Sequence, residues 1–405
     1  MSSSARTPTA LAVAIVAIAT WLTTFLAPPV ADNGRSEGDV LEPPPAESPE
    51  PDEGRTDASA DAEANVLLVW GHGGTDATFS GRVRTLPGVT AVSAVRVDRR
   101  DLLAAVDADG RSATDLPPAW VYPLDTAAID PGDHEAVLGA LIGDLASLVP
   151  GAALLTEASA ALRGLGPGAR LTLADGSERE IIGVVGDRVG GYAELIVHPD
   201  DSLAVDIERY LLVRHDGDGD EVAARIRAVA SEELRIRPLA ETTYPRHGDG
   251  VLPQVIIKTH FGEFAMNDVA GRRVQVGASW RREHLESRTL PHVGFTVCHR
   301  IVMDAFAAVL AELEERGLLD TLNPRQYQGC WLGRVIGSSR TLSHHSWGLA
   351  VDVNVNPADV FTADLHPEVI DVFRAHGFVW GGDFLRPDEP HFEYVGDLLE
   401  RPEPA

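Results

Sequence analysis

Two histidines and one aspartate near the end of the chain have the residue types and order of a metal site. His345 shortly precedes Asp352, and His391 follows in a later stretch. Two imidazoles and one carboxylate are the protein ligands of many catalytic zinc sites, which leave the fourth position to water. Zinc lowers the pKa of that water to about 7, so hydroxide becomes available at neutral pH. The three residues are therefore candidate zinc ligands of a hydrolase.

The elements that position these residues are expected to be strands. Residues 349–355 and 390–395 both alternate between apolar and polar side chains, which is the period of a half-buried strand. If the two strands pair, Asp352 and His391 meet on one polar face. His345 would reach the same point from the preceding loop.

A zinc hydrolase also needs a base that takes a proton from water and returns it to the leaving amine. Asp388, just before His391, is the first candidate for this base, and Glu389 is the second. Glu393 shares a strand face with His391. It either holds a ligand imidazole or is an ordinary paired strand residue.

Three motifs occur in order in this part of the chain: Ser343-x-His345-x-x-Gly348-x-Ala350-x-Asp352, Trp380-Gly381-Gly382-Asp383 and Asp388-Glu389-Pro390-His391-Phe392-Glu393. Together they resemble VanY-type D-alanyl-D-alanine carboxypeptidases and the related L-alanyl-D-glutamate endopeptidases. These are zinc peptidases that share their fold with the zinc-binding domain of Hedgehog proteins. Upstream, Phe261-Gly262-Glu263-Phe264, Cys298-His299-Arg300 and Tyr327-x-Gly329-Cys330 resemble actinobacterial-type members. The resemblance covers residues 252–396.

The resemblance implies roles for single residues. His345, Asp352 and His391 would bind Zn²⁺, and Asp388 would be the catalytic base. Arg334 would bind substrate or the oxyanion, the alternative being an arginine that is exposed or held in an ion pair.

Two more residues are expected at the substrate. Ser343 would place a hydroxyl beside the ligands, and Trp347 would line the substrate groove, with core packing as its alternative. His344 competes with His345 for the metal, but only His345 has the family spacing.

The two cysteines, Cys298 and Cys330, fit an oxidising compartment. A disulfide between them would close a loop of about 32 residues and stabilise the fold by roughly 3 to 4 kcal/mol in the chain-entropy model. Two buried free thiols are the alternative.

Composition narrows the class of protein. The 405 residues exceed one ordinary domain, and 44% hydrophobic residues suffice for packed cores. With 34 basic and 61 acidic residues the formal charge is −27, which repels phosphate backbones and argues against nucleic acid as a partner.

The N-terminal segments predict export. An apolar run from Ala10 to Ala27 makes residues 1–31 a signal peptide or a membrane anchor. Residues 32–63 are rich in proline and acidic residues and are expected to form a disordered linker. The protein would then be extracytoplasmic, either membrane-anchored through this N-terminal helix or secreted.

The fold class expected is α+β, in two parts. Residues 64–245 form a separate mixed α+β module, with strands around 66–70, a hairpin at 170–185 and a helix over 135–149. The stretch 168–187 resembles the extracytoplasmic core domain of MacB and FtsX-type permeases, which implies an envelope protein as a partner.

Residues 252–400 form the peptidase-like domain, with an antiparallel sheet and flanking helices at 299–316 and 367–376. The function expected is a zinc peptidase that cuts next to D-amino acids in peptidoglycan stem peptides. The alternative is a non-catalytic cell-wall-binding or regulatory envelope protein.

Overall fold

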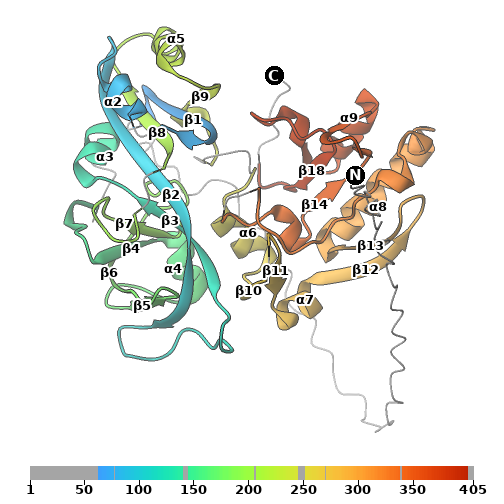
Figure 1. Cartoon of the computed structure of the whole chain (residues 1–405), viewed down its shortest axis with the longest axis horizontal. Coiled ribbons are helices and arrows are strands. Elements are labelled where there is room, and N and C mark those ends of the chain that lie inside the picture. Colours follow the sequence, from blue (N-terminus) through green and yellow to red (C-terminus); the bar gives the residue numbers. More distant parts are fainter. Residues whose placement is uncertain are drawn as a thin grey trace, which may run out of the picture. The chain divides into compact units, whose positions relative to one another are not determined.

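The computed structural model describes residues 63–399 except 77, 140–144, 205–206, 245–250, 270 and 338–339. Helices and strands are mixed along this part of the chain (Figure 1), which confirms the α+β class. The expected signal or anchor and nearly all of the expected linker lie outside the described residues. None of the described helices is long and apolar enough to cross a membrane.

Residues 66–238 contribute a nine-stranded sheet in the order β3-β7-β4-β6-β5-β2-β8-β1-β9, and β3 also pairs with β2. The long strand β2 therefore belongs to two parts of the sheet, pairing with β8 early and with β5 late (Figure 1). The strands are β1 (Val66–Thr75), β2 (Val89–Val106), β3 (Tyr122–Ala128), β4 (Ala152–Thr156), β5 (Arg170–Leu173), β6 (Glu178–Val185), β7 (Leu195–Val197), β8 (Glu208–His215) and β9 (Leu234–Pro238). The helices are α2 (Phe79–Arg84), α3 (Pro131–Leu138), α4 (Glu157–Arg163) and α5 (Gly219–Val229).

Local sequence signals explain most of these elements. The expected hairpin is present as β5 and β6, which pair antiparallel around a turn where Gly176 has a φ of 83°. The expected helix over 135–149 is wrong at both ends. Helix α3 begins at Pro131, where the Asp130 side chain accepts from the Asp133 amide. It ends at Leu138 because Gly139 has a φ of 65°, a conformation that other residues rarely adopt.

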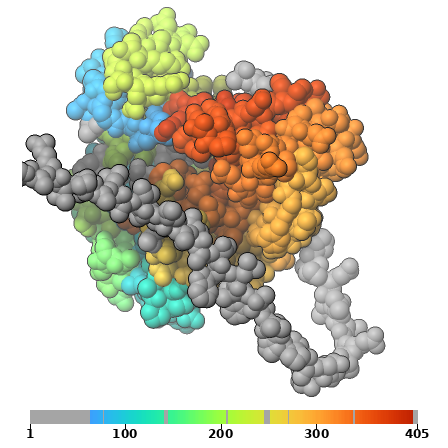
Figure 2. Space-filling view, turned by 45° about the vertical axis from the view of Figure 1, so that its right-hand side comes forward, coloured from blue at the N-terminus to red at the C-terminus, as the bar shows by residue number. Residues whose placement is uncertain are grey.

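The last part of the chain packs around one apolar core that draws buried side chains from Val251 to Val395. On the face seen in Figure 2, the residues coloured yellow to red form one continuous body. Its helices are α6 (Gln254–Phe261), α7 (Ala278–His284), α8 (Arg300–Glu315) and α9 (Pro367–Ala375). Its strands are β10 (Met266–Asp268), β11 (Val274–Val276), β12 (Leu285–Leu290), β13 (Gly294–His299), β14 (Ala350–Asp352), β15 (Val355–Asn356), β16 (Asp359–Ala363), β17 (Phe378–Trp380) and β18 (His391–Tyr394).

Apolar periodicity decides how helix α8 packs. Its residues Val302, Phe306 and Leu310 recur at helical spacing, and all three are buried in this core. Helix α9 packs beside α8 and against β17 (Figure 1). Both helices lie where the sequence predicts them, and α9 packs against β17 of the small sheet β14-β18-β17.

A buried cluster of charged side chains joins α6 to the nine-stranded sheet. Lys258 Nζ lies 2.6 Å from Glu194 Oε2, and Arg163 Nη2 lies 2.6 Å from Glu194 Oε1. Glu263 pairs with Arg163 and lies 3.7 Å from Lys258. The side chains of Lys258 and Glu194 are 0% exposed. Buried charges are tolerated only when they are paired in this way.

Candidate metal centre

The structure brings His345, Asp352 and His391 together. Strands β14 and β18 pair antiparallel, with Asp352 directly opposite His391. His345 lies on the short 3-10 helix η5 (His344–Trp347), which ends at Gly348 with a φ of 70°. A Cβ on Gly348 would lie 2.6 Å from the backbone nitrogen of His299, so glycine is required at this turn.

The three side chains share one small volume. One ligand atom from each lies within 4.8 Å of the others. Asp352 Oδ2 is 3.1 Å from His345 Nε2, and Asp352 Oδ1 is 2.8 Å from His391 Nδ1. The histidines are 3% and 6% exposed. Within residues 63–399, as far as they are described, no other His, Cys, Asp or Glu group is arranged to hold a metal ion.

The remaining ring nitrogen of each histidine faces a protein oxygen. His345 Nδ1 lies 2.6 Å from the carbonyl oxygen of Cys330, and His391 Nε2 lies 3.0 Å from Glu393 Oε1. Because these oxygens are acceptors, each nitrogen donates its N–H there. In a neutral ring the other nitrogen, His345 Nε2 or His391 Nδ1, then keeps its lone pair and faces Asp352.

This donor set fits a metal cation such as zinc. His345 Nε2 is buried and has no hydrogen-bond partner among the described residues. The lone pairs of His345 Nε2 and His391 Nδ1 both face the Asp352 carboxylate and repel it unless a cation lies between them. In metal sites, a hydrogen bond from the nitrogen that does not bind the metal is what orients a ligand histidine. Without a metal, a proton on His391 takes the place of the cation. Burial lowers its pKa, but the hydrogen bonds to Asp352 and Glu393 outweigh burial and raise it to about 10.

Asp388 lies beside the cluster with an available carboxylate. Burial raises the pKa of Asp388, the nearby His391 lowers it, and the Asp352 charge raises it again. No hydrogen bond or ion pair engages its side chain among the described residues. The second candidate, Glu389, is occupied, because its carboxylate accepts a hydrogen bond of 2.9 Å from the backbone of Ala363.

Arg334 is held through its backbone and leaves its guanidinium available. Ser346 Oγ accepts from the Arg334 amide at 3.1 Å and donates to its carbonyl at 2.9 Å. Burial lowers the pKa of the half-buried guanidinium, while the charges of Asp352 and Asp388 raise it. Over the described residues, no ion pair holds this group. A charged guanidinium in this position can bind a carboxylate or an oxyanion.

The expectation that Trp347 lines a substrate groove is wrong. Its side chain is 0% exposed and packs in the core, where the indole N–H donates to the Gly262 carbonyl at 3.1 Å. Ser343 is 3% exposed and directly precedes η5, and its amide donates to the Arg334 carbonyl at 3.0 Å. It lies beside the cluster, and its contact with substrate stays a prediction.

Glu393 connects more of the site than the sequence indicates. Besides His391, it contacts His344, whose Nδ1 lies 2.7 Å from Oε2, and it accepts from the Val251 amide at 3.1 Å. His344 is thus held by Glu393 and is not part of the metal group. The shared strand face of His391 and Glu393 is a sequence signal for the first contact. Nothing in the sequence indicates the contact of His345 with the Cys330 carbonyl.

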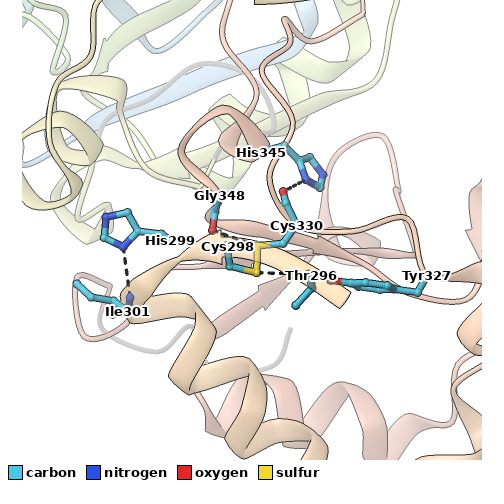
Figure 3. The surroundings of a disulfide bond; sticks show 8 residues. All are labelled: Thr296, Cys298, His299, Ile301, Tyr327, Cys330, His345 and Gly348. Atoms are coloured by element: carbon cyan, nitrogen blue, oxygen red, sulfur yellow. Dashed lines mark hydrogen bonds between the residues drawn. A yellow bond between two sulfur atoms is a disulfide. The ribbon is translucent and has the colours of Figure 1, made fainter. Parts of the chain in front are cut away.

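Cys298 and Cys330 form a disulfide with a Cα–Cα distance of 5.3 Å. Figure 3 shows the bond between β13 and the segment that carries the carbonyl facing His345. Both cysteines are buried, at 0% and 2% exposure. The covalent link therefore lies directly behind one member of the metal group.

Comparison with known proteins supports the candidate metal centre in the C-terminal part of the chain. Residues 336–394, which contain all three members of the metal group, match the family model described as D-alanyl-D-alanine carboxypeptidase. No protein with a curated function matches the chain.

Two solved structures align with the chain at low identity. The periplasmic region of MacB from Actinobacillus actinomycetemcomitans aligns at 10% identity over 44% of this chain and 90% of that one, with a TM-score of 0.31. The extracellular domain of the ABC-type transporter YknZ from Gram-positive bacteria aligns at 13% identity over 43% of this chain and 100% of that one, with a TM-score of 0.29. Similarity at this level establishes no shared fold. What the family match and the geometry around Asp352 do establish is that the C-terminal part of this chain is similar to the D-alanyl-D-alanine carboxypeptidase family.

Proposed function

We propose that this protein is a zinc-dependent peptidase that hydrolyses peptide bonds next to D-amino acids in peptidoglycan stem peptides. The observation that carries the proposal is the arrangement of His345, Asp352 and His391, with both histidine rings fixed from behind. The family match over residues 336–394 supports the peptidase chemistry. The scissile bond is either the terminal D-alanyl-D-alanine bond or the L-alanyl-D-glutamate bond.

In this proposal His345, Asp352 and His391 hold the zinc ion. A zinc ion bound there supplies Lewis-acid chemistry, which polarises a carbonyl and makes water a better nucleophile near neutral pH. Asp388 takes the proton of the attacking water and returns it to the leaving amine. Arg334 binds the oxygen that becomes negative, or the terminal carboxylate of the peptide.

The place of action follows from the substrate class. Peptidoglycan lies outside the cytoplasmic membrane, so we propose the cell envelope as the location, with the N-terminal apolar run as signal or anchor. Residues 64–245 are proposed as a separate module that meets an envelope protein, and residues 252–400 as the catalytic domain.

The test is incubation of the purified protein with peptidoglycan fragments, with and without a chelator, and analysis of the products by mass spectrometry. Loss of a terminal D-alanine that is abolished by chelation and restored by zinc establishes a carboxypeptidase. Cleavage inside the stem peptide establishes the endopeptidase. Bound zinc without any product contradicts the proposal and favours a non-catalytic cell-wall-binding protein.

A further inference from the structure

The segment Gln328–Leu332, called here the bracing segment, contacts two of the three proposed ligands. Its Gln328 amide donates to the Asp352 carbonyl at 3.1 Å, and the Asp352 amide donates to Gly329 at 3.3 Å. The Leu332 amide donates to the His345 carbonyl at 2.9 Å. The Cys330 carbonyl faces His345 Nδ1 at 2.6 Å (Figure 3). The bracing segment thus fixes His345 through its backbone and its ring, and Asp352 through its backbone.

On its other side the bracing segment is attached to β13. The Trp331 amide donates to the Val297 carbonyl at 2.9 Å, and the disulfide joins Cys330 to Cys298. Strand β13 is firmly placed, because it pairs with β12 over six positions, from Leu285 opposite His299 to Leu290 opposite Gly294. It leads directly into helix α8, whose apolar face is buried. The disulfide is therefore the covalent link between a rigid element and the carbonyl that orients His345.

We propose that the Cys298–Cys330 disulfide is a positioning device for the metal centre. It holds the Cys330 carbonyl where it accepts the proton of His345 Nδ1, and so keeps the lone pair of Nε2 directed at Asp352. This inference rests on the proposed function only in taking His345 and Asp352 as ligands. A backbone carbonyl cannot be replaced by mutation, so the disulfide is the part of this contact that can be removed.

The experiment compares the zinc affinity of the full chain with that of a Cys298→Ala/Cys330→Ala variant, by competition with a chelator of known affinity. Alanine leaves no polar group in the buried site. Loss of an orienting partner of a metal ligand typically weakens binding about 10- to 100-fold, and that loss is expected here. The matched control is Ile226→Ala, which truncates a buried α5 side chain in a core cluster that contains no residue of the bracing segment. Its zinc affinity should equal that of the wild type.

Equal zinc affinity in the double variant and the wild type overturns the proposal. Absence of zinc binding by the wild type itself contradicts the proposed function instead, so the two failures are distinguishable.

If the double variant does not fold, the wild type provides a second test. Because coupling between two equilibria is reciprocal, bound zinc should shift the equilibrium between the disulfide and the two thiols toward the disulfide, by the same factor of about 10 to 100. The oxidised fraction is measured in a thiol redox buffer by alkylation and mass spectrometry, and an equal fraction with and without zinc overturns the proposal.

Discussion

The four carboxylates around the metal centre differ in what each one faces. Asp352 faces both histidines, and Glu393 holds His391 and His344 from behind. Glu389 is bonded to backbone, and Asp388 is available. The four carboxylates are chemically similar, so their different roles are set by their hydrogen-bond partners.

Replacing Asp388 with Asn removes the group that we expect to carry the proton. Turnover of peptidoglycan fragments should fall about 10²- to 10⁴-fold, with zinc content unchanged, since Asp388 is not a proposed ligand. Glu389→Gln is the matched control, because that carboxylate only accepts from Ala363. Full activity of Asp388→Asn in a steady-state assay would remove Asp388 from the mechanism.

Replacing Glu393 with Gln keeps the shape of the side chain and removes its charge. His391 then loses the anion that accepts from its Nε2 and so directs Nδ1 at Asp352, and zinc affinity should fall about 10- to 100-fold in a chelator competition. Glu221→Gln, at an exposed ion pair with Arg225, serves as control and should bind zinc like the wild type. An unchanged affinity of Glu393→Gln would assign Glu393 to packing alone.

Spacing was sufficient to predict the cluster but not its surroundings. Because side chains alternate along strands, the positions of Asp352 and His391 already place them on one face, and the structure pairs them. Trp347 could not be assigned, since a tryptophan next to a ligand suits a groove or a core equally. The contact of the Cys330 carbonyl with His345 could not be predicted either, because every residue has a backbone carbonyl and the sequence does not show where it points.

Among the elements, α3 carries a histidine whose neutral form is favoured by burial. His134 is 0% exposed, its Nδ1 lies 2.8 Å from Ser93 Oγ on β2, and its Nε2 lies 2.9 Å from the Val189 carbonyl. Burial lowers its pKa to about 4 from the usual 6.5, while the hydrogen bond to the Val189 carbonyl and the charge of Asp133 raise it. The two contacts tie α3 to β2 and to the segment around Val189.

This histidine should make stability depend on pH. Below pH 6.5 His134 binds a proton in the unfolded chain, whereas in the folded protein it binds one only near pH 4. The contribution of His134 is thus complete above pH 6.5 and is lost as the pH falls toward 4, by up to about 3 kcal/mol. Urea unfolding of the metal-free protein across this range should show a steeper decline for the wild type than for His134→Asn. Parallel curves would contradict the assignment.

Element prediction succeeded where local signals were strong. Helices α8 and α9 lie as expected because apolar residues recur at helical spacing and suitable end residues follow. The helix expected over 135–149 differs at both ends, because Asp130 caps α3 at its start and Gly139 ends it, and neither signal lies in the apolar pattern. The ring-like pairing of β3 with both β7 and β2 depends on contacts distant in sequence, which periodicity does not contain.

For the molecule as a whole, the buried charges of Lys258, Glu194 and Arg163 form the junction between α6 and the nine-stranded sheet. Lys258→Met should destabilise the protein by about 3 to 5 kcal/mol, because it leaves buried carboxylates without one of their cations. Arg225→Met at an exposed pair should cost no more than about 1 kcal/mol. Chemical unfolding monitored by tryptophan fluorescence measures both. Equal effects would mean that water reaches the junction.

Lys258 is also the only lysine in the chain, and its side chain is wholly enclosed. A lysine-specific protease therefore has a single target, at the point where α6 meets the sheet. The native protein should resist this enzyme, and any cut must report an opening of that junction. The single lysine thus serves as a reporter, and the rate of this cleavage would show how often α6 opens at the junction.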